Sequence, residues 1–100
     1  MLHLETKHQK VVQQILAKYP YKFYVYGSRA KGNARNLSDL DLCYQENIPD
    51  AVAFLIEEEF KESDLPFRVE LISWKRMKPS FQALIKGDLT KVAKRFFGKN

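Results

Sequence analysis

One stretch of this 100-residue chain, residues 27–42, constrains its fold and function more than any other. An apolar, aromatic run over residues 22–27 leads into it and predicts a strand that ends at Gly27-Ser28. Small residues at such a turn let backbone N–H groups approach a ligand closely, and successive N–H groups can hold an anion. We therefore expect Gly27 and Ser28 to bind phosphate, whereas the ordinary structural role of Ser28 would be a helix N-cap.

Two acidic residues follow this turn after ten intervening residues. Acidic and apolar residues alternate over residues 39–45, which predicts a strand with Asp39 and Asp41 on one face and Leu40 and Leu42 on the other. Two neighbouring carboxylates repel each other unless a cation lies between them. Mg²⁺ prefers oxygen ligands and commonly binds one or two carboxylates together with substrate phosphates. The pattern therefore predicts a metal site beside the phosphate-binding turn. Metal-assisted nucleotidyl transfer requires these two features together.

Two basic residues, Arg29 and Lys31, lie in the short helix that we expect after the turn. Both are either ordinary surface charge or ligands of a bound phosphate. Arginine in particular binds phosphate with two parallel N–H bonds. We therefore predict that at least one of the two contacts a nucleotide.

The remaining periodicities predict one small domain that spans residues 1–100. They place helices at 4–18, at 50–62, from Ser80 to Gly87 and at 88–97, and a further strand at 67–72. The second of these helices has a stripe that we expect to be buried, made of Val52, Leu55, Ile56 and Phe60. The expected fold class is α/β (α+β), with a mixed sheet of three or more strands and helices packed on one face.

Composition and charge indicate the cellular compartment of the protein and the kinds of partner that it can bind. The sequence has no apolar run long enough to span a membrane and no apolar core of a signal peptide, and its single cysteine forms no internal disulfide, so we expect a cytoplasmic protein. The net charge of +5 is uneven, because residues 75–100 hold eight Lys or Arg residues and one acid. This basic end is suited to ATP, RNA or an acidic partner, or is simply a solvated face.

The central stretch resembles a known signature. Gly27-Ser28, ten residues and then Asp39-x-Asp41 resemble the motif of the nucleotidyltransferase superfamily typified by DNA polymerase β. The fuller form, Gly-Ser-Arg-Ala-Lys-Gly followed by Ser-Asp-Leu-Asp-Leu, resembles its smallest members, the minimal nucleotidyltransferases. The similarity covers nearly the whole chain. It implies a palm-like fold, and it implies that related chains can place a final strand in the tail.

The resemblance also implies a set of roles. Asp39 and Asp41 would bind two Mg²⁺ ions, and ATP would be the nucleotide substrate. The third carboxylate of the family, usually an aspartate, corresponds to Glu70, which would share one ion and help to deprotonate the acceptor hydroxyl. The alternative for Glu70 is a surface acid paired with a neighbouring cation. Ser28 and nearby N–H groups would hold the β- and γ-phosphates.

Minimal nucleotidyltransferases are typically encoded with a helical HEPN-type protein. In such toxin–antitoxin pairs the HEPN member is often a toxic ribonuclease, and the nucleotidyltransferase inactivates it by adenylylating a tyrosine. The resemblance implies this role here. Two alternatives remain open: a subunit of a two-chain enzyme that modifies small hydroxyl compounds in the manner of aminoglycoside nucleotidyltransferases, and a non-catalytic module that binds RNA or a partner.

Overall fold

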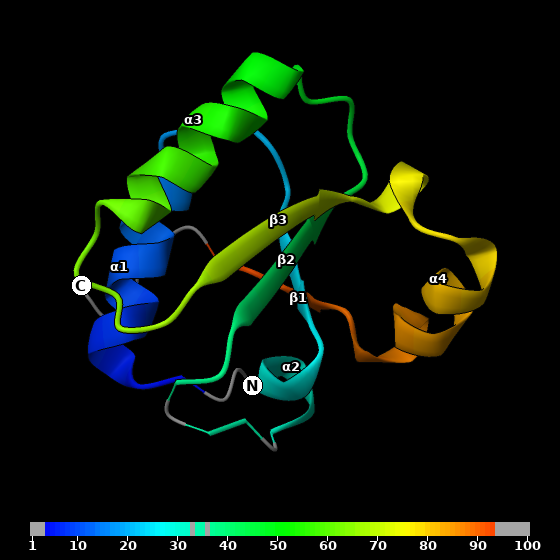
Figure 1. Cartoon of the computed structure of the whole chain (residues 1–100), viewed down its shortest axis with the longest axis horizontal. Helices are drawn as coiled ribbons and strands as arrows, with labels where there is room; N and C mark the ends of the chain where they lie inside the picture. The colour runs from blue at the N-terminus through cyan, green and yellow to red at the C-terminus, as the bar shows by residue number, and fades with distance from the viewer. Residues whose placement is uncertain (1–3, 33, 36, 94–100) are drawn as a thin grey trace.

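A computed structural model describes residues 4–32, 34–35 and 37–93 of the chain (Figure 1). In chain order the elements are α1 (Thr6–Leu16), β1 (Tyr24–Tyr26), α2 (Ser28–Lys31), β2 (Leu40–Tyr44), α3 (Asp50–Lys61), β3 (Val69–Ser73), the 3-10 helix η1 (Trp74–Arg76), α4 (Pro79–Ile85), the 3-10 helix η2 (Lys86–Asp88) and β4 (Thr90–Lys91). Within these described ranges, none of the helices has the length and apolarity needed to cross a membrane.

The four strands form one mixed sheet in the order β3-β2-β1-β4. Strand β2 pairs with β1 in an antiparallel ladder and with β3 in a parallel one. The parallel connection is made by α3, as expected because parallel neighbours need a long crossover. The predicted mixed sheet is therefore confirmed, and β2, which carries Asp41, is a central strand.

One face of the sheet holds the main apolar core. The alternation of β2 directs Leu40 and Leu42 to this face, and both side chains are fully buried. Helices α1 and α3 cover it (Figure 1) and contribute Leu16 and Ile56, which are also fully buried. This face accounts for most of the apolar burial that stabilises the fold.

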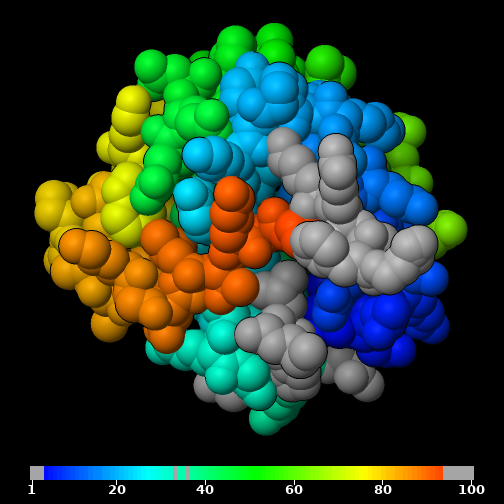
Figure 2. Space-filling model, turned by 180° about the vertical axis from the view of Figure 1, so that it is seen from behind, coloured from blue at the N-terminus to red at the C-terminus, as the bar shows by residue number. Residues whose placement is uncertain are grey.

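The opposite face carries a smaller apolar cluster at one end. Tyr26 and Cys43 of this face pack with Met77 and with Ile85 of α4. Helix α4 lies on the other side of the sheet from α1 and α3 (Figure 1), and seen from behind, the gold surface of α4 continues into the orange surface of η2 and β4 (Figure 2). The two longer helices thus follow the expectation of one covered face, and the short α4 adds partial cover to the other.

The prediction of a helix over residues 88–97 is wrong for the part that the structure describes. Thr90 and Lys91 form β4, which pairs antiparallel with β1. The backbone N–H of Val92 continues this pairing by donating to the carbonyl of Phe23 at 2.9 Å. Apolar residues every three or four positions also fit a short edge strand that buries one residue, and here Val92 is that residue, with 4% exposure. Residues 94–97 lie outside the described residues.

Two further expectations differ from the structure. In α3 the side chain of Leu55 is exposed, because the helix presents only a narrow stripe centred on Ile56 and Phe60 to the sheet. Helix α4 begins at Pro79 after an N-cap at Lys78, so Ser80 is not its cap. Proline is well suited to the first helical position because its missing N–H would have no intrahelical partner there.

Candidate active site

Three side chains from three strands lie in one row across the uncovered part of the sheet. The register pairs Tyr26 of β1 with Asp41 of β2, and pairs Asp41 with Glu70 of β3. Each of the three neighbours in sequence a residue of the main core, so all three point to the opposite face. The register therefore places Asp41 beside Glu70, the two acids that the family resemblance puts in one site, and adds Tyr26.

Asp41 is the electrostatic centre of this row. Burial, together with the nearby charges of Glu70 and then Asp39, raises the pKa of its carboxyl group to about 6. The ionised carboxylate is disfavoured because it has lost water and faces like charges. A cation at this position would reverse that preference.

The turn at Gly27 is built around the Asp41 carboxylate. Gly27 has φ 79° and ψ −155°, a backbone conformation that is essentially restricted to glycine. A Cβ atom on Gly27 would lie 2.7 Å from Asp41 Oδ2, closer than real Cβ contacts. Both the conformation and the space therefore require glycine, and they place the start of α2 directly beside the candidate catalytic acid.

Ser28 is the first residue of α2, and Gly27 rather than Ser28 is its N-cap. Among the described residues the Ser28 hydroxyl has no hydrogen-bond partner, so the alternative role of Ser28 as a helix N-cap does not apply. Lys31 lies at the other end of α2, half exposed, with its Nζ 3.8 Å from Asp88 Oδ2. The Lys31 ammonium group therefore lies at the surface near the turn. That Lys31 contacts a phosphate stays a prediction.

Arg29 has a different environment from the one that the sequence suggests. It is 4% exposed, and its guanidinium donates to the carbonyl of Ser38 through Nε at 3.1 Å and through Nη2 at 2.7 Å. The same group lies 4.2 Å from the ring centroid of Phe67. Burial lowers its pKa, and the charge of Asp39 opposes that shift. Arg29 is thus neither surface charge nor directed to solvent, and these contacts argue against direct phosphate binding.

The other two acidic residues are more open. Asp39 precedes β2, two residues from Asp41 on the same side, and is exposed. Glu70 forms an ion pair with Arg68, the residue directly before β3, with Nη2 to Oε2 at 2.9 Å, and its side chain is about one-third exposed. The alternative of a surface acid paired with a cation therefore describes part of the Glu70 environment, although its register beside Asp41 also fits the predicted role.

The described side chains contain no group of three or more His, Cys, Asp or Glu residues close enough to enclose a metal ion alone. Asp39, Asp41 and Glu70 act on one another electrostatically without converging on one point. An open arrangement of this kind suits Mg²⁺, which usually keeps water and substrate phosphates in its shell rather than an all-protein cage.

Tyr26 is not among the site residues that the sequence analysis assigned. Its ring is buried beside Phe81 of α4, in an edge-to-face contact with centroids 5.9 Å apart. Burial, and then the charges of Asp41, Cys43 and Glu70, raise the pKa of its hydroxyl to about 12. The hydroxyl is therefore a neutral neighbour of the carboxylates. The available signal was its place two residues before Ser28 at the end of β1.

Comparison with known proteins agrees with this geometry. The family described as "Polymerase beta, Nucleotidyltransferase" matches residues 9–95, which include every residue of the site. The chain belongs to this nucleotidyltransferase family. It is therefore an enzyme of the nucleotidyltransferase class, and its mixed four-stranded sheet agrees with the polymerase β-like fold. The chain is also 35% identical over 91 residues to a probable protein adenylyltransferase MntA from Haemophilus influenzae, covering 85% of this chain and 78% of that protein.

Proposed function

We propose that this nucleotidyltransferase transfers AMP from ATP to the hydroxyl of a tyrosine on a HEPN-type partner and so acts as an antitoxin. The adenylyl group and the protein acceptor are supported by the similarity to a probable protein adenylyltransferase. The observation that carries the proposal is the juxtaposition of Gly27, Asp41 and Glu70, because it combines a glycine turn at the start of α2 with two acids on one face.

Two Mg²⁺ ions are the proposed cofactors, held by Asp39, Asp41 and Glu70. These residues fit such ions because their oxygen donors suit hard cations. In addition, burial and the like charges of Glu70 and Asp39 raise the pKa of Asp41, an effect that a bound cation would oppose. When bound, the ions would neutralise triphosphate charge and acidify the attacking hydroxyl.

The residues of this chain have separate proposed tasks. The backbone at Gly27 and the hydroxyl of Ser28 would bind the β- and γ-phosphates, helped by the positive end of the adjacent helical turn. Lys31, the last residue of α2, would add positive charge near the triphosphate. Glu70 would accept the proton of the acceptor hydroxyl, and the O–P bond would form as the bond to pyrophosphate breaks.

The acceptor must approach from the open side of the row. Glu70 lies on β3, an edge strand of the sheet, and it is more exposed than the residues of the covered face. A macromolecular acceptor can reach such an edge without entering a deep pocket. This access supports a protein acceptor, and it leaves a small hydroxyl compound as an outcome that the test must distinguish.

The test is label transfer from α-labelled ATP with Mg²⁺, with and without the product of the adjacent reading frame, which would be the proposed HEPN-type partner. We expect label on a tyrosine of that protein, loss of label in Asp41→Asn, and wild-type labelling in Asp64→Asn, a matched change at an exposed turn residue. Label on small alcohols or aminoglycosides but not on the partner would instead favour the small-molecule enzyme. Equal labelling by Asp41→Asn and wild type would overturn the assignment of the site.

A further inference from the structure

Arg29 is the one charged side chain that is buried among the described residues. Removing a guanidinium from water is unfavourable unless its N–H groups find acceptors. A fold that buries one at the edge of a candidate active site constrains the backbone that supplies those acceptors. The contacts of Arg29 therefore indicate which part of the site depends on it.

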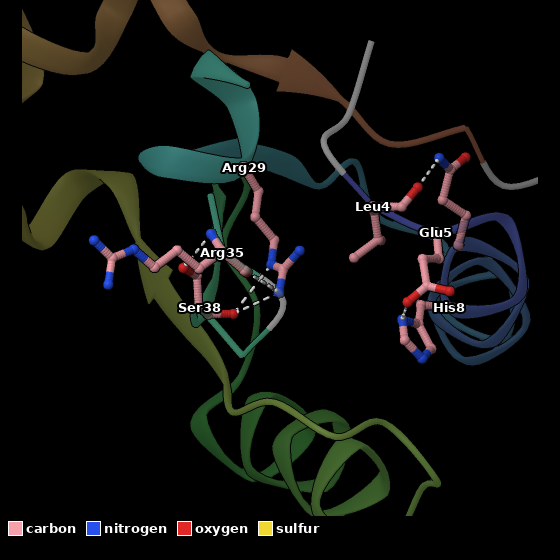
Figure 3. Close-up of polar contacts among 7 residues, drawn as sticks. Leu4, Glu5, His8, Arg29, Arg35 and Ser38 are labelled. Atoms are coloured by element: carbon pink, nitrogen blue, oxygen red, sulfur yellow. Dashed lines mark hydrogen bonds and ion pairs between the residues drawn. The ribbon is translucent and has the colours of Figure 1, made fainter. Parts of the chain in front are cut away.

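The guanidinium of Arg29 is directed to the turn before β2 (Figure 3). Besides its two bonds to the Ser38 carbonyl, Nη2 lies 3.4 Å from the carbonyl of Arg35. The turn is closed by the Ser38 N–H, which donates to the Arg35 carbonyl at 3.0 Å, and by the Arg35 N–H, which donates to Ser38 Oγ at 2.8 Å. The carbonyls that face Arg29 thus belong to one closed turn whose last residue, Ser38, is joined to Asp39.

The other side of the guanidinium is fixed by Phe67. The ring of Phe67 is buried, stacks on the guanidinium and receives His8 edge-on at a centroid distance of 5.5 Å. The next residue, Arg68, accepts the N–H of Leu40 at 2.8 Å, the bond that begins the pairing of β2 with β3. Arg29 therefore connects α2, the turn before β2 and the segment that leads into β3, and each of these segments carries or leads into at least one candidate site residue.

We propose that Arg29 is a positioning residue that fixes the carboxylate of Asp39 for metal binding. The planar guanidinium holds the Ser38 carbonyl with two N–H groups, so the peptide that leads into Asp39 has one orientation. Because the Asp39 side chain is exposed, this turn is the structure that holds the Asp39 backbone in place before β2. The proposal rests on the metal role given to Asp39 above.

The variants separate positioning from stability. Arg29→Met keeps the apolar length of the side chain and removes every N–H bond, whereas Arg29→Lys keeps the charge and loses the planar two-bond geometry. Arg35→Met is the matched control, because the exposed Arg35 side chain has no contact among the described residues and its backbone contacts to the turn remain. Ile56→Val weakens the core on the covered face and provides a destabilised reference with an intact turn.

The measurement is the Kd for Mn²⁺, a spectroscopic substitute for Mg²⁺, determined by electron paramagnetic resonance with a non-cleavable ATP analogue present. Amide hydrogen exchange at Ser38 and Asp39 is followed in parallel. We expect Arg29→Met to raise the Kd about 10–100-fold and to speed exchange at both amides, with a smaller effect in Arg29→Lys. Arg35→Met and Ile56→Val are expected to keep the wild-type Kd.

Wild-type Mn²⁺ affinity in Arg29→Met, or an equal loss in Ile56→Val, would overturn the positioning role while leaving the proposed function intact. A wild-type protein that binds no Mn²⁺ would overturn the metal assignment itself. If Arg29→Met does not fold, the comparison of Arg29→Lys with Phe67→Leu, which removes only the stacked ring, decides the question. Both are then expected to weaken Mn²⁺ binding relative to Ile56→Val.

Discussion

The two faces of β2 have opposite relations to their surroundings. Leu40 and Leu42 point into the main core and are fully buried, with apolar contacts on every side. Asp41, between them in sequence, points to the other face, where burial and the like charges of Glu70 and Asp39 raise its pKa. The leucine face of β2 is thus stabilised by packing within the chain, whereas the Asp41 face would be stabilised by binding a cation.

This difference separates stability from function along a single strand. The leucine face stabilises the chain through apolar burial, which requires no ligand. The carboxylate face destabilises the isolated chain through like-charge repulsion, and strain at functional sites commonly has this character. Substitutions on the two faces should therefore change different measurable properties.

The largest expected effect on folding is on the leucine face. Leu42→Ala removes a fully buried side chain from the centre of the sheet and leaves a cavity between α1, α3 and β2. We expect the free energy of unfolding to fall by about 2–5 kcal/mol. Urea denaturation at pH 7 measures it, and a loss under about 1 kcal/mol would show that this face is not the main source of stability.

The next effect tests the contact between the two strands on the carboxylate face. Gly27→Ala forces a side chain into a conformation that favours glycine and toward Asp41 Oδ2. We expect a loss of about 1–3 kcal/mol in unfolding free energy together with loss of nucleotide transfer. A fully stable and fully active Gly27→Ala protein would contradict the close packing of this turn on Asp41.

The pH dependence sharpens the comparison because the leucine face does not titrate. The folded pKa of Asp41, about 6, lies above its ordinary value of 3.8, so the folded state binds the proton more tightly. The contribution of Asp41 to stability is therefore largest below pH 4, falls as the pH rises from 4 to 6 and is level above 6. Discounted for partial exposure, the fall amounts to about 1 kcal/mol.

Metal-free unfolding curves at several pH values measure this fall. Asp41→Asn should lack it and should be at least as stable as the wild type at pH 7, although it is expected to transfer no label. If the unfolding free energies of the wild type and Asp41→Asn changed in the same way between pH 4 and pH 6, the raised pKa of Asp41 would have no support.

The smallest effect on stability is expected at Ser28. Its hydroxyl has no partner among the described residues, so Ser28→Ala should change the unfolding free energy by less than about 0.5 kcal/mol. The loss of a hydrogen bond to a charged phosphate should nevertheless weaken triphosphate binding by about tenfold. Calorimetric titration with ATP checks this, and unchanged affinity would exclude Ser28 as a phosphate ligand.

The sequence predicted most of this arrangement where the signal was local. Alternation over residues 39–45 was enough to separate the leucines from Asp39 and Asp41, and the strand before Gly27 was bounded by clear turn residues. Asp41, which follows from this alternation, and Glu70, whose role the family resemblance implies, lie together in the structure because the register of β2 and β3 aligns them.

The errors arose where partners are distant in sequence. The environment of Arg29 depends on Phe67, 38 positions later, and on carbonyl groups that any residue type can supply, so its burial left no trace in the pattern. The pairing of Thr90 with Val25 is likewise non-local and involves a strand of two residues. In α3 the periodicity gave the position of the buried stripe but not its width, which depends on how close the sheet lies.

The most direct test of the central claim is the titration of the Asp41 carboxylate by carbon-13 NMR, with and without Mg²⁺ and a non-cleavable ATP analogue. The structure gives a pKa of about 6 in the metal-free protein. Binding of Mg²⁺ and nucleotide should lower this pKa well below its ordinary value, because direct attraction by the cation stabilises the ionised carboxylate and outweighs burial and the like charges of Glu70 and Asp39. A carboxylate that titrates near 4 without metal and does not respond to Mg²⁺ would contradict the account of an incomplete, cation-requiring face.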